Sequence, residues 1–159
     1  MDKIDLHILH LLQTDNRRSA AELGQEVGLS VSAASDRIRR LNASGLIHAN
    51  RAVVNSTEIG LALCVFMFVD LEPRADEQAF IKALMQLPEV QEAHHVSGPH
   101  SWLLKVRVHN AAALQYLLSN HLKSLPCVLR TESIIVLDTA KETTELALTV
   151  TSVVDGGET

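Results

Sequence analysis

The sequence predicts an α+β protein in which an N-terminal winged helix-turn-helix precedes a ferredoxin-like βαββαβ sandwich domain. Two observations lead to this fold class. The first part of the chain combines helical apolar spacing with a glycine turn, most clearly in GLSVSAASDRIRRL at residues 28–41. Later in the chain, strand and helix patterns occur twice in the same order, so that ALMQLPEVQEA at 83–93 aligns with HLKSLPCVLRT at 121–131.

The first expected helix lies in DKIDLHILHLLQTD, residues 2–15. Asp2 and Asp5 stand near its start, where the helix dipole favours negative charge. Its apolar residues fall at helical spacing: Ile4, Ile8, Leu11 and Leu12. The segment therefore indicates an amphipathic helix with one buried face.

A second helix is expected to begin after Ser19, which forms the spacing of a capping box with Glu22. Its inner stripe consists of Ala20, Leu23 and Val27. Gly28 follows where a helix end requires left-handed backbone. Gly24 is small at the point where two crossing helices would meet. These features predict the turn of a helix-turn-helix.

A third helix follows at once, because Ser30 can cap it after the single residue Leu29. Its inward face is expected to hold Val31, Ala34, Ile38 and Leu41. The segment GLIHANRAVVN at 45–55 is β-like and stands in the position of a short wing. An amphipathic helix with a polar, basic outer face after a glycine turn is typical of a recognition helix.

Double-stranded DNA is therefore the expected partner of the first unit. Small residues beside the arginines would allow close approach to phosphates and base edges. The alternative is that Arg39 and Arg40 form only a solvated surface. The candidate DNA-binding residues are Ser30, Ser32, Ala33, Ser35, Asp36, Arg37, Arg39, Arg40 and Arg51.

Charge is unevenly distributed along a chain whose formal net charge is −5. Residues 1–51 carry seven Lys or Arg against six Asp or Glu, and the remainder carries seven against thirteen. An acidic protein can bind DNA when its basic groups share one face. We expect four parts: a winged helix-turn-helix at 1–51, a linker strand at 52–60, a ligand-binding and dimerisation domain at 61–148, and a tail at 149–159.

The second domain reads as strand, helix, strand, repeated once. Strands are expected at 61–71, 90–97, 102–109 and 128–138, and helices at 76–87 and 111–124. This order gives one antiparallel sheet with both helices on one face. The strand LALCVFMFV at 61–69 is apolar on both sides, so a second subunit is expected to cover the other face.

Composition excludes several classes of protein. The same apolar run at 61–69 is far shorter than the ~20 residues of a membrane helix, and no basic, then apolar leader begins the chain. Cys64 and Cys127 lie on apolar runs without metal-ligand spacing, which indicates buried thiols in a reducing compartment. We therefore expect a cytoplasmic protein without a membrane partner.

Three histidines raise the question of a metal. His94 and His95 are adjacent on an expected strand, so their side chains face opposite sides of the sheet and do not share an ion easily. His100 follows in a loop. We expect no metal site and no cofactor.

These motifs together resemble the leucine-responsive regulatory protein/AsnC family of transcriptional regulators, also called feast/famine regulators. The stretches that carry the resemblance are DKIDLHILHLLQTDNRRS, ELGQEVGLSVSAASDRIRRLNASGLI, LPEVQEAHHVSG, WLLKVRV and VLDTAKETTELAL. The resemblance covers residues 2 to about 148. It implies a sandwich domain that dimerises, dimers that often assemble into discs of eight, and a small effector, usually an amino acid, bound between dimers.

One loop departs from the family pattern Gly-x-x-Asp-Tyr. Here it reads Gly98-Pro99-His100-Ser101-Trp102, so that the aspartate is Ser101 and the tyrosine is Trp102. Ser101 cannot supply the counter-charge that a buried ammonium requires, which leaves the effector class open. The candidate effector-binding residues are Gly98, His100, Ser101, Trp102, Leu103, Thr131 and Ser133.

Other roles are open for three of these residues. Thr131 and Ser133 share one strand face and could instead be cross-strand partners. Trp102 could anchor two subunits as readily as it could form a ligand platform.

Two rival functions follow from the same architecture. Some haem-pathway decarboxylases resemble AsnC-type regulators, and the stretch HHVSGPH at 94–100 keeps such an enzyme in view. A stand-alone small-molecule sensor is the other. Neither explains a basic outer face on the third helix, so we expect a regulator without catalytic residues.

Overall fold

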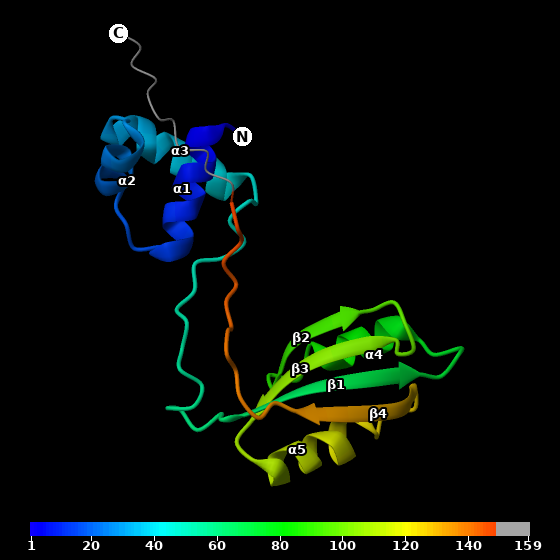
Figure 1. Cartoon of the computed structure of the whole chain (residues 1–159). Coiled ribbons are helices and arrows are strands. Elements are labelled where there is room, and N and C mark those ends of the chain that lie inside the picture. Colours follow the sequence, from blue (N-terminus) through cyan, green and yellow to red (C-terminus); the bar gives the residue numbers. More distant parts are fainter. Residues whose placement is uncertain (149–159) are drawn as a thin grey trace. The chain divides into compact units, whose positions relative to one another are not determined.

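The structure is a computed structural model that describes residues 1–148 and consists of two compact units (Figure 1). The N-terminal unit comprises residues 1–52 together with 141–148, and the sandwich unit comprises 53–140. The sequence-based boundary assigned 141–148 to the second domain, whereas the structure groups this segment with the first. The expected tail at 149–159 lies outside the described residues.

Three helices form the N-terminal unit: α1 (Lys3–Thr14), α2 (Ala20–Val27) and α3 (Val31–Ala43). Ile8, Leu23 and Leu41, one from each helix, are buried together at its centre. This confirms the helix-turn-helix expected from the sequence. The burial of one aliphatic side chain from each helix fixes how the three pack.

The turn between α2 and α3 follows the sequence-based prediction closely. Gly28 ends α2 in the left-handed conformation, with φ at 71°. Ser30 caps α3 by accepting a hydrogen bond from the backbone N–H of Ala33. Gly24 is buried, and a Cβ atom placed there would lie 2.8 Å from the carbonyl oxygen of Leu29. Only glycine therefore allows α2 to approach the turn this closely.

Two expectations for this region are not met. Val31 was expected on the inward face of α3 but is 56% exposed, because it lies in the first turn, beyond the reach of the α1–α2 core. The described residues between α3 and position 62 form no strand, so the β-like wing at 45–55 and the linker strand at 52–60 are irregular chain. No neighbouring strand offers these residues a ladder of hydrogen bonds.

Arg37 joins α3 to the start of α1. Its Nη1 lies 2.6 Å from a carboxylate oxygen of Asp2 and 2.7 Å from one of Asp5. The same two aspartates form a capping box at the start of α1. Burial raises the pKa of Asp5, but hydrogen bonds from the Asp2 N–H and from Arg37 outweigh it and hold the pKa below its ordinary value. The Arg37 side chain is only 20% exposed.

The last described segment returns to α1. The side-chain amide of Gln13 forms two hydrogen bonds with the backbone of Leu146: the Leu146 N–H donates at 2.8 Å and the Leu146 carbonyl accepts at 3.1 Å. This pairing agrees with the grouping of 141–148 with the N-terminal unit.

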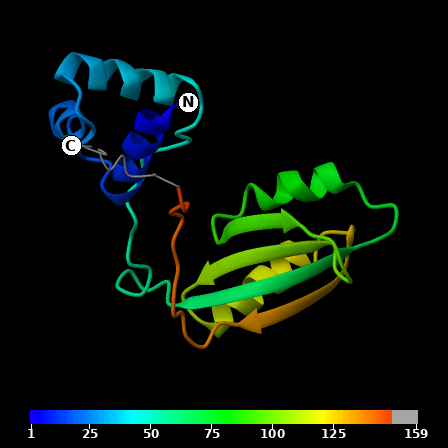
Figure 2. The same cartoon turned by 45° about the horizontal axis from the view of Figure 1, so that its top comes forward.

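The sandwich unit has the expected βαββαβ order. Its strands are β1 (Leu63–Leu71), β2 (Val90–His95), β3 (Trp102–Val108) and β4 (Val128–Ile135), and its helices are α4 (Glu77–Leu84) and α5 (Ala111–Leu117), the latter continued by a π-helical turn, η1 (Leu118–Leu122). The sheet order is β2-β3-β1-β4, and every neighbouring pair is antiparallel. Figure 2 shows α4 and α5 on the same side of the sheet.

The alternation of side chains gives this sheet two different faces. Val65, Met67 and Val69 of β1 face the helices and are fully buried, together with Leu104 and Val106 of β3. The residues between them point to the opposite side, which we call the open face. It carries Phe66, Phe68 and Asp70 of β1, Leu103 and Lys105 of β3, and Arg130, Glu132 and Ile134 of β4.

No helix within residues 1–148 is both long enough and apolar enough to span a membrane.

Replacement of Gly24 tests the helix-turn-helix packing. Gly24→Ala should lower the free energy of unfolding of the N-terminal unit by about 1–3 kcal/mol, because the new methyl group overlaps a backbone oxygen that cannot move freely. Urea unfolding followed by circular dichroism measures this change. Gln25→Ala, on the exposed side of the same helix, is the control and should change stability by no more than about 0.5 kcal/mol.

Replacement of Arg37 tests the ion pair between α3 and α1. Arg37→Gln should destabilise the protein at neutral pH. The lowered pKa values of Asp2 and Asp5 mean that their contribution is present above the ordinary aspartate pKa of about 3.9 and disappears as the pH falls through the lower folded-state values. The stability difference between variant and wild type should therefore vanish in acid.

Arg17→Gln is the matched control for this ion pair. Arg17 pairs with Asp15 at the surface, with its side chain 87% exposed. Its replacement should change stability little at any pH. A difference for Arg37→Gln that persists unchanged in acid would contradict the electrostatic origin.

Candidate DNA interface and effector site

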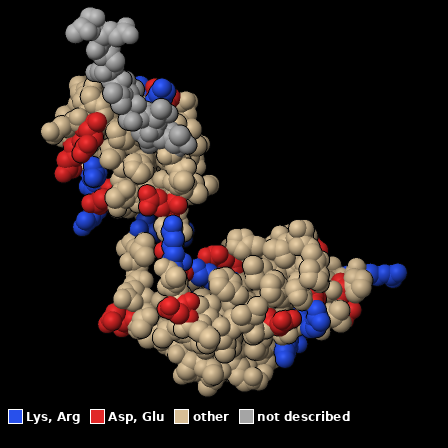
Figure 3. All heavy atoms as spheres, in the orientation of Figure 1, with Lys and Arg blue, Asp and Glu red and all other residues tan. Residues whose placement is uncertain are grey.

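The outward face of α3 is polar and carries small side chains. Ser32, Ser35, Asp36, Arg39 and Arg40 are all exposed. Arg39 donates to Asp36 at 2.7 Å, but both side chains are well exposed, so this pair is screened and exchangeable. Figure 3 shows basic and acidic side chains next to one another on the N-terminal unit, not one continuous basic surface in that view.

The other candidate DNA-binding residues lie in different surroundings. Ser30 is engaged as the cap of α3 and its hydroxyl lies 3.2 Å from that of Ser32. Ala33 is half-buried beside the outward face. Arg37 is turned toward α1 by its two aspartate partners. Arg51 is exposed in the irregular segment after α3. Sequence spacing placed Arg37 on the flank of the outer face and kept it among the DNA-binding candidates, although two aspartates in the first helix were a possible signal of another partner.

The loop between β2 and β3 places His100 against the open face. Gly98 has a φ of 129°, which glycine adopts readily. The His100 ring stacks on Phe68 with centroids 4.5 Å apart. Its Nδ1 lies 3.2 Å from both carboxylate oxygens of Asp70, and the Ser101 N–H donates to the same carboxylate at 3.2 Å. An ionised carboxylate only accepts, so Nδ1 carries the proton.

Asp70 is the centre of this network. Arg130 of β4 approaches it with Nε at 3.1 Å and Nη2 at 3.0 Å. Burial raises the pKa of Asp70, but the hydrogen bonds from His100, Arg130 and Ser101 outweigh it, and the pKa is lowered. Glu132 lies 4.0 Å from Nε2 of His100. The sequence-based candidates omitted Asp70 and Arg130, although a charged residue at the end of the apolar strand CVFMFVD was a usable signal.

The sheet separates the remaining effector candidates. Leu103 lies on the open face with His100, whereas Thr131 and Ser133 are paired with Val69 and Met67 and share the helix-covered side. Within one protomer the loop and the two hydroxyls therefore do not line a common cleft.

Trp102 belongs to the core of its own protomer. It is 7% exposed and packs edge-on against Phe80 of α4, with centroids 5.5 Å apart. Its Nε1 is buried without a hydrogen-bond partner in the structure of residues 1–148. From the sequence, Trp102 was weighed as a subunit anchor or a ligand platform. Neither role accounts for its burial in the core of its own protomer.

The histidines behave as the strand geometry predicts. His94 pairs with Leu103 and His95 with Trp102, so the two lie on opposite faces of the sheet. His94 contacts Glu92 at 3.3 Å, and His95 stacks obliquely on Trp102. In the part of the chain that the structure describes, no three His, Cys, Asp or Glu side chains gather as a metal site would require.

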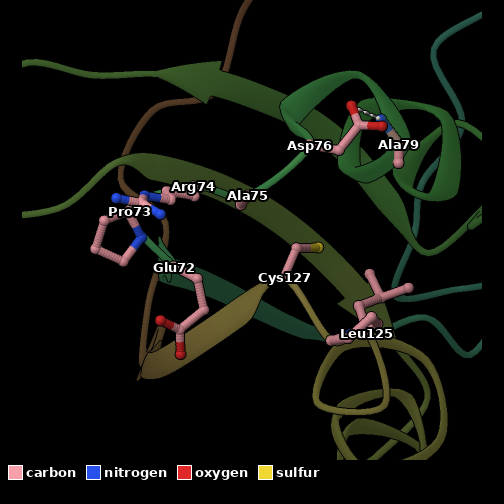
Figure 4. Close-up of a pocket in the computed structure, with 9 residues that line it drawn as sticks. Glu72, Pro73, Arg74, Ala75, Asp76, Ala79, Leu125 and Cys127 are labelled. Atoms are coloured by element: carbon pink, nitrogen blue, oxygen red, sulfur yellow. Dashed lines mark hydrogen bonds between the residues drawn. The ribbon is translucent and has the colours of Figure 1, made fainter.

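A depression of about 600 Å³, separate from the network around Asp70, lies at the end of the sandwich unit where β1 ends (Figure 4). It is formed by the turn before α4 and the turn before β4. Asp76 is occupied in capping α4 through the Ala79 N–H, and Cys127 is a free, half-buried thiol. The lining consists of Glu72, Pro73, Arg74, Ala75, Asp76, Ala79, Leu125, Pro126 and Cys127. No set of polar groups converges in it to recognise a particular ligand.

Comparison with known proteins assigns both units. The AsnC-type helix-turn-helix domain matches residues 1–42, and the Lrp/AsnC ligand binding domain matches residues 64–146. The leucine-responsive regulatory protein of Escherichia coli K12 is 37% identical over 150 residues, which cover 93% of this chain and 92% of that protein.

Solved structures agree with this assignment. A transcriptional regulator from Neisseria meningitidis, in complex with L-Met, superposes with a TM-score of 0.90 at 28% identity, over 94% of this chain and 97% of that one. AsnC of Escherichia coli superposes with a TM-score of 0.85 at 28% identity, over 91% and 97% of the two chains. Because both domains match in order and the relatives align along nearly the whole length, this chain belongs to the Lrp/AsnC family of DNA-binding transcriptional regulators.

Proposed function

We propose that this regulator reads a specific DNA sequence with the outward face of α3, works as a homodimer or larger homo-oligomer, and responds to an effector of the amino-acid class. The observation that carries the proposal is the exposed face of α3, which combines small and basic side chains while the opposite side is fixed to α1 and α2. Cytoplasmic location accords with such a role.

The arginines of α3 have different roles in this proposal. Arg39 and Arg40 are exposed and able to reach phosphates or base edges, with Ser32 and Ser35 small enough to let the helix approach. Arg37 instead orients α3 through its ion pair with α1. We assign Arg51, which is exposed in the segment after α3, to the DNA backbone beside the helix. The outward face is thus the reading surface, and Arg37 is part of the scaffold.

The acidic sandwich unit is compatible with DNA binding. Its excess negative charge repels phosphate only over short distances, because salt at physiological concentration screens charge over about 8 Å. Basic groups gathered in the N-terminal unit then act locally, whatever the sign of the net charge.

Self-association is supported by the open face. Phe66, Phe68, Leu103 and Ile134 form an apolar centre there, and charged residues surround it. An apolar centre with a polar rim is the usual composition of a protein interface. The family resemblance extends this to larger closed assemblies such as octamers.

The effector site is proposed at the loop that contains Gly98, His100 and Ser101. The Neisseria relative was solved in complex with L-Met, which supports an amino acid as the class of effector. Thr131 and Ser133 lie on the other side of the sheet, so they would join this loop only when contributed by another subunit. That arrangement agrees with an effector bound between dimers.

The alternative of a haem-pathway decarboxylase has little support. The relatives compared above are regulators, and His100 is engaged with Asp70 in a contact that holds the loop. The regulator explains the helix-turn-helix unit, which the enzyme would not use.

The DNA interface is tested by single substitutions on α3. Arg39→Ala and Arg40→Ala should each weaken binding to a site selected from random duplex DNA by ~1–3 kcal/mol where the arginine reads a base. If the arginine contacts a phosphate instead, its replacement should weaken binding to all sequences and reduce the salt slope by about one. Fluorescence anisotropy at several salt concentrations separates these cases.

Arg17→Ala removes the same charge from the α1–α2 connection and serves as the control. It should leave affinity for the selected site within about 0.5 kcal/mol of wild type. Wild-type affinity in both α3 variants would show that α3 is not the recognition helix.

The open face is tested by sedimentation of the full-length protein without DNA. The wild type should be at least a dimer at micromolar concentration, and Ile134→Glu should shift it toward monomer, because a carboxylate at the apolar centre loses its hydration on association. Met85→Glu replaces a side chain that is 78% exposed at the end of α4 and should not change assembly. A monomeric wild type would refute self-association.

A further inference from the structure

The effector loop has no carboxylate of its own, but a carboxylate from a different strand lies beside it. Ser101 occupies the position of the aspartate in the family pattern. The Asp70 carboxylate, at the end of β1, accepts a hydrogen bond from the backbone N–H of this same residue at 3.2 Å. A negative charge is therefore restored at the loop by a residue that lies 31 positions earlier in the chain.

The carboxylate is paired with a cation that can exchange. Arg130 holds Asp70 through Nε and Nη2 at 3.1 and 3.0 Å, and its side chain is 61% exposed. Arg130 is the exposed partner, so water solvates it well when it turns away from Asp70. Asp70, only 15% exposed, keeps the hydrogen bonds from His100 and from the Ser101 N–H, so it stays in place when Arg130 turns to a ligand.

We propose that the Asp70–Arg130 pair recognises the zwitterionic head of an α-amino acid, with the ligand's ammonium bound by Asp70 and its carboxylate by Arg130. This inference rests on the proposed effector function and names its recognition chemistry. When a zwitterion lies between Asp70 and Arg130, each of the two side chains has an opposite charge of the ligand next to it. A ligand with only one charge supplies an opposite charge to only one of the two partners.

The neighbours of the pair fit this role. His100 stacks on Phe68 and donates from Nδ1 to Asp70, so it keeps the carboxylate oriented when Arg130 turns to the ligand. Glu132 is 57% exposed on the far side of His100. Asp70 and Glu132 place two carboxylates near the one guanidinium of Arg130, which favours ligands that carry an ammonium over purely anionic ones.

The test compares three ligands and two variants of the full-length protein. L-methionine carries both charges, L-methioninamide keeps only the ammonium, and N-acetyl-L-methionine keeps only the carboxylate; L-leucine and its derivatives form a parallel series. Asp70→Asn and Arg130→Gln remove one partner each. Binding is measured by calorimetry, and the emission of Trp102, the only tryptophan, gives an independent signal next to the loop.

We expect each variant to weaken the binding of a different pair of ligands. Asp70→Asn should weaken L-methionine and L-methioninamide about 10-fold or more but spare N-acetyl-L-methionine. Arg130→Gln should weaken L-methionine and N-acetyl-L-methionine by a similar factor but spare L-methioninamide. Glu92→Gln removes a carboxylate from the Lys105–Glu92 ion pair on the same face and should change none of the three.

A merely structural role for the pair predicts that each variant weakens all three ligands equally, and that result would overturn the inference. So would wild-type affinity for L-methionine in both variants, which would leave the proposed effector function standing. A wild type that binds no member of either series would refute this inference together with the effector part of the proposed function, while DNA binding is judged separately by anisotropy.

Discussion

A four-stranded sheet with both helices on one face leaves its other face uncovered, which is unfavourable where that face is apolar. In this protein the constraint is strong, because β1 is apolar on both sides: Val65, Met67 and Val69 fill the core under the helices, and Phe66 and Phe68 face outward. The βαββαβ connection leaves no further element of the sandwich unit to cover the outer side. The proposed self-association follows from this one-sided cover.

Two arginines of α3 lie in different surroundings although they are close in the sequence. Arg37 and Arg39 are two positions apart, yet one is held by Asp2 and Asp5 against α1 and the other is exposed beside Asp36. Helical geometry places positions two apart on different sides of the helix. The ion pairs of Arg37 add to the apolar core in holding α3 at one rotation about its axis. In the proposed function, this rotation sets which side chains of α3 face the DNA.

Much of the fold could be predicted from the sequence, because the signals were local. The caps at Ser19 and Ser30, the left-handed Gly28 and the small Gly24 each act within a few residues. The strands and helices of the sandwich unit follow from periodicity in the same way. The wing did not form because a strand requires a partner, and the segment at 45–55 has none among the described residues.

The candidate site was predicted less well, because its contacts are distant in the sequence. Asp70 and Arg130 are 60 positions apart in the sequence, and no local pattern predicts that they pair. Thr131 and Ser133 were grouped correctly on one strand face, but which face depends on the register with β1. Trp102 was weighed as a subunit anchor or a ligand platform, whereas its register with Val69 directs it into the core of its own protomer.

The return of the chain to α1 has a consequence for the order in which the protein is made. The three helices around Ile8, Leu23 and Leu41 are complete once α3 has been synthesised, so the DNA-binding core can assemble while the rest is still being translated. The hydrogen bonds between Gln13 and Leu146 form only after the entire sandwich unit has followed. The unit that can fold first thus gains these two hydrogen bonds only after the sandwich unit has been made.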